Sequence, residues 1–505
     1  MRRLLLLCAL LVGLTASGQN EVRQLQKLLR AYRTVEQMYL DTVDVEQLTD
    51  DAIRGLLEGL DPHSAYLTKE EMKSTEVAIE GEFGGIGVEY QINRDTITVM
   101  AVVVGGPAES VGMLAGDRIV KIDTLPAVGF TQQDVLKHLR GEVGSRVRVE
   151  VVRRGSERLL EFWLTRAKIP LHTVDASYMA TPRVGYIKLS RFGRTTVEEF
   201  AAAYERLGAP RRLILDLRGN GGGLLDQALG LAEFFLPKGS LLLTTKGRTD
   251  ERKFYARNDG RMLTGEVVVL IDGQSASASE IVAGALQDWD RATIIGRRSF
   301  GKGLVQRQLP LGDGSAMRLT ISQYHTPAGR AIQRPYTKGE RREYYLDNLR
   351  GYTDSITDST PHYRTLKRGR KIYGGGGVRP DVEVQADTTG YTEYYAQLMR
   401  RGILTQTVTD WLDKERNALL QDYPTLEKYL ADYAPSEGIV SALVAAAEKA
   451  GVKYNDEQFE RSRHWIMTLM KAHLAQRLYG IEGFYRVVNP TLNESYVEAL
   501  KHFEK

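Results

Sequence analysis

Two short stretches of the chain carry residue types that hydrolytic chemistry requires. Ser275–Glu280 reads Ser-Ala-Ser-Ala-Ser-Glu and follows the apolar run 267–271, while Lys302 stands between two glycines, twenty-five residues after Ser277. An apolar run, a serine at its exit and helix-forming residues beyond predict a strand-to-helix turn, which exposes a nucleophile beside free backbone amides. A lysine amine can serve as the base for such a serine when it is held neutral. Together the stretches predict a Ser/Lys hydrolase.

Spacing does not identify the nucleophile within the first stretch. Ser275, Ser277 and Ser279 are equally plausible, and all three stay open from the residues alone. Ser277 and Glu280 also fit a capping box, in which the serine only caps the helix that follows.

A glycine-rich segment, Asp216–Gly223, lies between an apolar strand and a helix. Glycines there let backbone N–H groups converge on a developing negative charge, as an oxyanion hole requires. The same glycines fit a tight turn that needs positive φ. Both interpretations stay open.

Other reactive motifs find less support. Gly296–Gly303 nearly matches a phosphate-binding loop, but Gly303 stands where a serine or threonine must hold magnesium. Ser299 and Lys302 match a Ser-x-x-Lys tetrad, but no Ser-Asp-Asn or Lys-Thr-Gly follows. The eight histidines are scattered, and His63 and His325 are expected to be structural, although spacing does not exclude a Ser/His/Asp triad. We expect neither a metal nor a cofactor.

Composition predicts a globular protein of about three domains, with 505 residues, 42% hydrophobic and 26% charged. The net charge of +4 is small and spread along the chain, which argues against a nucleic-acid partner. The one compact basic run, 367–371, is expected to be a solvated loop.

The first residues have the pattern of a secretory signal peptide, residues 1–18. Arg2 and Arg3 precede an apolar stretch from Leu4 to Leu14, and small residues lead to Gly18. The only cysteine, Cys8, lies inside this stretch, so a mature chain would have no disulfide. No later segment approaches 18 apolar residues, so we expect an exported, periplasmic protein with no integral membrane span.

The remaining chain divides by pattern into four parts. Residues 19–80 have helical periodicity, 81–168 are short alternating strands, 169–385 alternate apolar strands with helices, and 386–505 are helical without recognisable chemistry. Alternation of strands and helices predicts an α/β layer. Within it, residues 338–373 are polar and are expected to form a surface excursion.

Residues 81–168 resemble a PDZ domain of the bacterial protease type. The resemblance rests on Gly85-Ile86-Gly87-Val88, followed by Gly106–Glu109 and Gly116–Asp123. In PDZ domains the turn between these glycines presents backbone amides to a peptide's C-terminal carboxylate, and the peptide adds as a strand to the sheet edge. The peptide-binding residues implied are Gly85, Ile86, Gly87 and Val88.

Together the motifs resemble the C-terminal processing peptidases, or tail-specific proteases. The match covers roughly residues 60–385 and includes Leu60–Ser64, the PDZ segment, Asp216–Gly223, Ser275–Glu280 and Phe300–Gln306. It implies Ser277 as the nucleophile, Lys302 as the base and Gln306 as an orienting amide. It also implies oxyanion donors in the backbone of Gly222, Gly223 and Ala278. Ser299 stands where the family more often has threonine.

The resemblance implies an α/β core of the crotonase-like type, with a PDZ domain inserted before it and helices at both ends. The expected function is that of an exported serine endopeptidase that binds unstructured protein C-termini through its PDZ domain and cleaves peptide bonds. A homo-oligomer through the helical ends and an adaptor protein are expected as further partners. The alternatives are a PDZ tail receptor that only holds ligands and an inactive scaffold. Retention of Ser277, Lys302 and Gln306 argues against the first of these.

Overall fold

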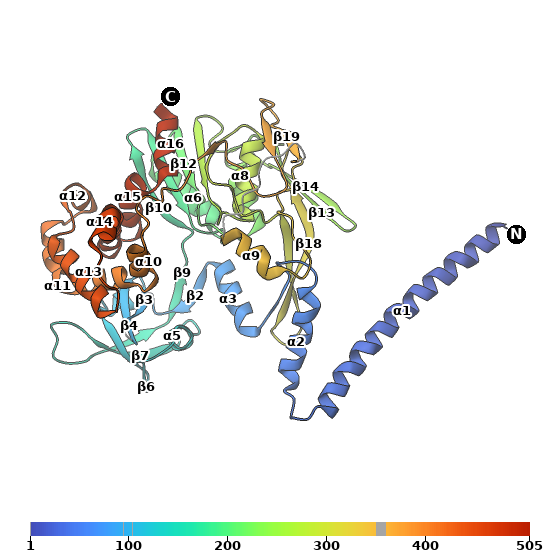
Figure 1. Ribbon diagram of the computed structural model, residues 1–505, viewed down its shortest axis with the longest axis horizontal. Helices are drawn as coiled ribbons and strands as arrows, with labels where there is room; N and C mark the ends of the chain where they lie inside the picture. Colours follow the sequence, from blue (N-terminus) through green and yellow to red (C-terminus); the bar gives the residue numbers. More distant parts are fainter. Residues whose placement is uncertain (1, 94, 104, 350–359, 505) are drawn as a thin grey trace. The chain divides into compact units, whose positions relative to one another are not determined.

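The computed structural model describes residues 2–93, 95–103, 105–349 and 360–504 (Figure 1). Residues 350–359 of the expected surface excursion 338–373 lie outside the described residues. The chain forms two compact units. The first unit comprises Met1–Lys69, Gln306–Thr320 and Tyr336–Tyr345, and the second unit comprises Glu70–Val305, Ile321–Pro335 and Leu346–Lys505.

The first unit begins with helices α1 (Arg2–Met38) and α2 (Val45–Glu58). The Asp44 carboxylate caps α2 by accepting a hydrogen bond from Gln47 N, as expected for an N-cap aspartate. Strand β1 (Ala65–Leu67) then pairs antiparallel with the first residues of β18 (Ala316–His325). None of the helices in the described part of the chain has the length and apolar character needed to cross a bilayer.

The PDZ segment is a sheet in the order β3-β4-β5-β7-β8, closed on one side by helix α5 (Gln132–Leu139). Alternate residues of β7 point into its core, where Val147, Val149 and Val151 are fully buried. Strands β2 (Glu82–Gly85) and β9 (Ala167–Pro170) pair where the chain enters and leaves. The strands are β3 Val88–Asn93, β4 Thr96–Val102, β5 Arg118–Ile122, β6 Leu125–Pro126, β7 Arg146–Val152 and β8 Leu160–Thr165.

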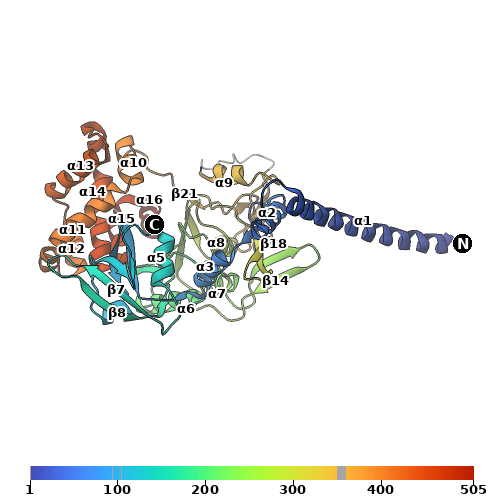
Figure 2. The same cartoon turned by 90° about the horizontal axis from the view of Figure 1, so that it is seen from below.

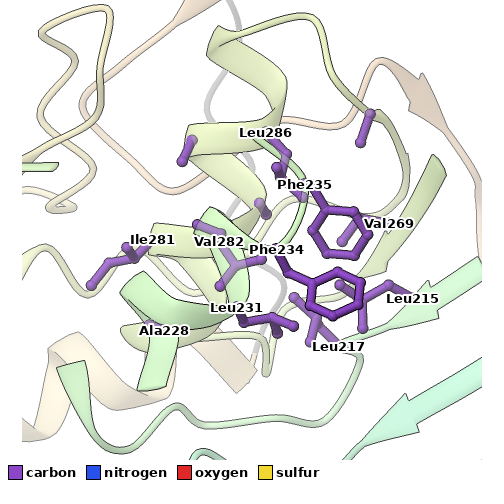
Figure 3. Packing of buried hydrophobic residues seen from close by; sticks show 14 of the residues in the cluster. Leu215, Leu217, Ala228, Leu231, Phe234, Phe235, Val269, Ile281, Val282 and Leu286 are labelled. Atoms are coloured by element: carbon purple, nitrogen blue, oxygen red, sulfur yellow. The ribbon is translucent and has the colours of Figure 1, made fainter. Parts of the chain in front are cut away.

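The α/β core is a six-stranded sheet in the order β10-β11-β12-β15-β16-β21, parallel from β11 onward, with β10 antiparallel to β11. Its central strands are buried on both faces, as parallel sheets require. On one face, Leu215 and Val269 pack against α7 (Leu225–Glu233) and α8 (Ala278–Asp288) (Figure 3). The strands are β10 Val174–Thr181, β11 Val184–Leu189, β12 Arg212–Asp216, β15 Glu266–Ile271, β16 Thr293–Gly296 and β21 Val382–Glu383.

Helices and a second sheet complete this core. Strand β18 pairs with β13, and β13 pairs with β14, both antiparallel. The elements are α6 Thr196–Arg206, α7 Leu225–Glu233, α8 Ala278–Asp288, β13 Leu241–Gly247, β14 Glu251–Tyr255 and β17 Leu304–Pro310; smaller ones are α3 Lys69–Glu80, α4 Pro107–Ser110, α9 Arg341–Leu349, β19 His362–Arg364 and β20 Lys371–Tyr373.

The C-terminal helices contribute to two different hydrophobic cores. Helices α10 to α14 gather around a core of their own (Figure 2). The last helix, α16, instead places Tyr496, Ala499 and Phe503 in one cluster with Ile214 and Val268 of the core sheet. The helices are α10 Glu393–Arg400, α11 Ile403–Asp422, α12 Leu426–Asp432, α13 Glu437–Lys449, α14 Asp456–Tyr479, α15 Ile481–Leu492 and α16 Glu494–Glu504.

The expected fold class, an α/β core with an inserted PDZ domain and helical terminal regions, is confirmed. The predicted boundary at residue 386 remains a prediction. Residues 386–505 nevertheless include a helix whose buried side belongs to the core of the α/β sheet.

Candidate active site

The predicted strand-to-helix turn holds Ser277 in an unusual backbone conformation. Strand β15 ends at Ile271 and α8 begins at Ala278. Ser277 lies between them with φ 54° and ψ −110°, a region that residues with a Cβ rarely adopt. Such strain occurs where the surrounding structure enforces it, and sharp strand–turn–helix serines are typical of hydrolase nucleophiles.

The two neighbouring serines are occupied with structural hydrogen bonds. Ser275 Oγ donates to the Leu217 carbonyl oxygen at 2.9 Å, and Ser279 Oγ donates to the Asn220 carbonyl oxygen at 2.9 Å. Both serines are fully buried, whereas Ser277 is partly exposed. The geometry therefore favours Ser277 as the reactive residue, with its neighbours holding the glycine-rich segment in place.

The glycine-rich segment is packed closely against its neighbours, including Ser277. This packing explains why two of its positions must be glycine. A Cβ on Gly222 would lie 2.8 Å from the Ser277 Cβ, and a Cβ on Gly223 would lie 2.1 Å from the Phe192 carbonyl oxygen. Both residues also have positive φ. Gly222 N donates to Asn220 Oδ1 at 2.9 Å, so this amide is already used inside the loop. Gly223 and Ala278 are therefore the stronger candidates for oxyanion donors.

A buried carboxylate, that of Glu280, joins the serine turn to the lysine loop. Its Oε2 accepts hydrogen bonds from the backbone N–H groups of Ser277 and Lys302, both at 2.8 Å. Its Oε1 accepts from Ser299 Oγ at 2.6 Å and from Gly301 N at 2.7 Å. Burial raises the pKa of Glu280, and these four donors oppose that rise by stabilising the charged form.

The Tyr324 hydroxyl joins the same two segments through their carbonyl groups. This oxygen lies 2.5 Å from the Lys302 carbonyl oxygen, to which it donates, and 3.2 Å from the Ser277 carbonyl oxygen. Tyr324 is buried. Sequence reasoning missed this residue, because no local pattern marks it. The capping-box pattern did indicate the contact of Glu280 with Ser277, but not its contacts with the lysine loop.

Lys302 and Gln306 were predicted to act together. Lys302 is partly exposed and lies in the loop that connects β16 to β17. Gln306 belongs to the first unit, where its Nε2 donates to the His63 carbonyl oxygen at 2.6 Å. Its predicted role as an orienting amide stays a prediction.

The histidines expected to be structural have packing contacts. The His63 ring lies 5.3 Å from the Tyr344 ring, and its Nδ1 lies 3.3 Å from the Tyr345 hydroxyl. The His325 Nδ1 lies 3.3 Å from the Gly329 carbonyl oxygen. Within the described ranges, no group of three or more acidic, histidine or cysteine side chains is arranged to hold a metal ion.

The PDZ segment has a groove of about 310 Å³ at the predicted peptide site. It runs between Gly85–Tyr90 and helix α5, which contributes Val135, Leu139 and the adjoining Arg140. Strand β3 is the last strand of its sheet, so one edge of it faces the groove. The Arg140 guanidinium stacks 4.1 Å above the Phe83 ring, and burial lowers its pKa.

Comparison with known families agrees with this arrangement. Residues 183–339 match peptidase family S41, residues 98–153 match the PDZ domain, and residues 12–71 match the N-terminal domain of the activating protease CtpB. Residues 394–480 match a family of unknown function.

Individual relatives cover most of the chain. A carboxy-terminal-processing protease of Bartonella bacilliformis is 38% identical over 327 residues, which is 63% of this chain and 75% of the relative. The carboxy-terminal processing protease CtpA of Bacillus subtilis is 30% identical over 417 residues, 79% of this chain and 88% of the relative. A solved photosystem II D1 C-terminal processing protease aligns over 71% of this chain and 92% of its own, with 27% identity and a TM-score of 0.37. This chain therefore belongs to peptidase family S41, the serine-type carboxy-terminal processing proteases.

Proposed function

We propose that this protein is an exported serine endopeptidase with Ser277 as its nucleophile, Lys302 as its general base and Gln306 as an amide that orients the lysine. The observation that carries the proposal is the shared Glu280 carboxylate, because it fixes the backbone of Ser277 and of Lys302 on one oxygen. A catalytic pair must be held to within fractions of an ångström, and backbone anchoring supplies that precision.

The reaction uses the lysine as an acid and as a base in turn. The neutral Lys302 amine takes the proton of Ser277 Oγ as this oxygen attacks the scissile carbonyl carbon. The protonated lysine then gives its proton to the leaving amine, and the acyl-enzyme is hydrolysed by a water that Lys302 activates in the same way.

The developing oxyanion needs donors that are already in place. We assign these to the backbone N–H groups of Gly223 and Ala278. Ala278 is the first residue of α8, whose positive dipole end favours the negative charge.

Substrate selection is assigned to the PDZ groove. A substrate's C-terminal carboxylate binds to the amides of Gly85, Ile86 and Gly87, and the strand before it pairs with the free edge of β3 from Val88 onward. Apolar side chains of α5 line the other wall, and Arg140 adds a positive charge. The occupant is an unstructured protein tail, because only an extended segment can add to a sheet edge.

Export and assembly are further parts of the proposal. Residues 1–18 have the pattern of a cleaved signal peptide, and we infer a periplasmic location. Helix α1 exposes Leu25, Leu28, Leu29, Val35 and Met38, and the half-buried Tyr32 completes their three- and four-residue spacings. A second copy of the chain or an adaptor protein would cover this face.

Replacing the nucleophile tests the proposal. Ser277→Ala should abolish hydrolysis of an unfolded protein substrate but leave folding intact, since loss of a helix N-cap serine costs only about 1 kcal/mol. The matched control is Ser190→Ala, a serine outside the turn. An active Ser277→Ala enzyme would refute the assignment, and a wild-type protein that binds tails without cutting them would favour the receptor alternative.

A further inference from the structure

We propose that Asn493, at the junction of α15 and α16, is a positioning residue for the oxyanion loop, defined as residues 217–223. The inference rests on the function proposed above and assigns to the C-terminal helices a part in catalysis. Asn493 is buried and lies 275 residues beyond Arg218 in the chain, yet the two side chains are hydrogen-bonded. Helix α16 lies beside strand β12, which leads into the loop (Figure 1).

The Asn493 amide is held at both of its ends. Its Oδ1 accepts a hydrogen bond from the Arg218 guanidinium and another from Tyr496 N at 3.1 Å. Its Nδ2 donates to Asn489 Oδ1 at 2.6 Å, and Asn489 in turn donates to the Tyr178 hydroxyl at 2.8 Å. A buried amide with fixed donors and an acceptor cannot turn freely, so it presents its oxygen to Arg218 in one direction.

Arg218 connects Asn493 to Asp216, the last residue of β12. Its Nε donates to Asp216 Oδ1 at 3.0 Å, its terminal nitrogen donates to Asp216 Oδ2 at 2.6 Å, and its backbone N–H donates to Asp216 Oδ1 at 2.9 Å. Asp216 is fully buried and also accepts from the Tyr186 hydroxyl at 2.7 Å. The guanidinium fork thus has Asp216 on one side and Asn493 on the other.

The position of Arg218 determines where the oxyanion loop begins. The Lys188 ammonium donates to the Arg218 carbonyl oxygen, and the next residue, Gly219, donates its N–H to Asp272 Oδ1 at 3.0 Å. Four residues later Gly223 is one of the proposed oxyanion donors. A shift of Arg218 toward the space that Asn493 fills would move these amides, and oxyanion stabilisation depends steeply on donor geometry.

A purely structural role for Asn493 must be separated from this one. Its Oδ1 also caps the first turn of α16 through Tyr496 N. Serine caps a helix about as well as asparagine, but its side chain is shorter and cannot reach Arg218 as well. Asn493→Ser therefore keeps the cap and removes the contacts with Arg218 and Asn489.

The test is the steady-state kinetics of Asn493→Ser in the full-length enzyme with an unfolded peptide substrate. We expect kcat to fall about tenfold while KM changes less than twofold, because an interaction that acts in the transition state is lost. The affinity for a peptide boronic acid, whose serine adduct places an oxygen in the oxyanion hole, should fall by a similar factor. An unchanged kcat would overturn the proposal, and so would a rise in KM without a fall in kcat.

The matched control is Ala499→Gly, which destabilises the same helix through lower helix propensity and the loss of a buried methyl group, without touching Arg218. It should keep wild-type kcat at a temperature where both variants are folded. An equal fall of kcat in Ala499→Gly would show that the effect is general loosening of α16 and would refute a role for Asn493.

Arg218→Lys changes the other partner of the same hydrogen bond. It replaces Asn493→Ser as the test variant if Asn493→Ser does not fold. Lysine keeps the charge beside Asp216 but lacks the fork that reaches two partners. We expect the same selective loss of kcat, and in a folded double variant the two losses should not add. Wild-type kcat in Arg218→Lys, or additive losses, would overturn the proposal. Ser277→Ala, assayed in parallel, separates the two levels: hydrolysis by Ser277→Ala refutes the proposed function, whereas a wild-type kcat in Asn493→Ser beside an inactive Ser277→Ala refutes the positioning role alone.

Discussion

Ser277 and Lys302 donate their backbone N–H groups to the same oxygen atom, Oε2 of Glu280, each at 2.8 Å. The carboxylate is fully buried, so this anchor is shielded from water. Because the bonds involve the main chain, neither the Ser277 hydroxyl nor the Lys302 amine is consumed by them. The spacing of the two backbone segments that carry the proposed nucleophile and base is therefore set by the fold.

Replacing Glu280 by glutamine should impair activity and stability together. The glutamine NH₂ group would face two of the four donors, and each buried donor left without an acceptor costs about 1–3 kcal/mol. We expect a lower thermal midpoint and a fall in kcat of at least about tenfold. Thermal unfolding and peptide hydrolysis measure both, with the exposed Glu251→Gln as control. A fully active, equally stable Glu280→Gln would contradict the anchoring role.

Tyr324→Phe tests the second link between the two loops. It removes only the hydroxyl that donates to the Lys302 carbonyl oxygen, and it keeps the buried ring. Losing one buried hydrogen bond should cost about 1 kcal/mol of stability, and kcat should fall several-fold because the lysine loop is less firmly held. The exposed Tyr255→Phe is the control, and it should match the wild type in both measurements. Equal kcat in the two variants would count against this role of Tyr324.

Activity should rise from neutral toward alkaline pH. Lys302 acts as a base only in its neutral form, and a lysine ammonium loses its proton in alkaline solution. The measurement is kcat/KM against pH, with circular dichroism to confirm that the enzyme stays folded. Added EDTA should leave the profile unchanged. A profile that falls toward high pH while the fold persists, or inhibition by EDTA that zinc reverses, would refute the Ser/Lys mechanism.

Acid should destabilise the core through Asp216. Burial alone would raise the pKa of Asp216, but the charges of Arg218 and Lys188 and the hydrogen bonds to it hold this pKa well below the unfolded value of 3.8. A depressed folded pKa adds stability above the unfolded value, and that stability is lost as pH falls through the folded value. Urea unfolding from pH 7 to pH 3 should show the free energy of unfolding decreasing below about pH 4. In Asp216→Asn the decrease should be shallower, from a lower starting stability.

The C-terminal carboxylate of a substrate should contribute directly to its affinity for the PDZ groove. A carboxylate gains charge-assisted hydrogen bonds from backbone amides that an amidated end cannot replace. Amidation should weaken binding by about 1–3 kcal/mol in titrations against the Ser277→Ala protein, which cannot consume the peptide. Equal affinities for the acid and amide peptides would mean that the groove recognises internal residues of the substrate and not its C-terminal carboxylate.

The sequence predicted the elements that local pattern encodes. The apolar run 267–271 followed by serines gave the β15–α8 turn, and the alternation of Val147, Val149 and Val151 gave a PDZ strand. Spacing could not separate Ser277 from Ser275 and Ser279, since the difference lies in which hydroxyls reach Leu217 and Asn220 across the fold. The contacts of Tyr324 and Asn493 were out of reach for the same reason, because their partners lie far away in the chain.

The cover that α16 provides for the core sheet has a consequence for the order of folding during synthesis. The cluster joins Ala176, Ile214 and Val268 to Tyr496 and Phe503, so one face of the sheet stays bare until the ribosome has added more than two hundred further residues. Contacts so distant in sequence form late and slowly. Until α16 has been made, a nascent chain that already contains both Ser277 and Lys302 lacks the cover of this sheet face and the contact of Asn493 with Arg218.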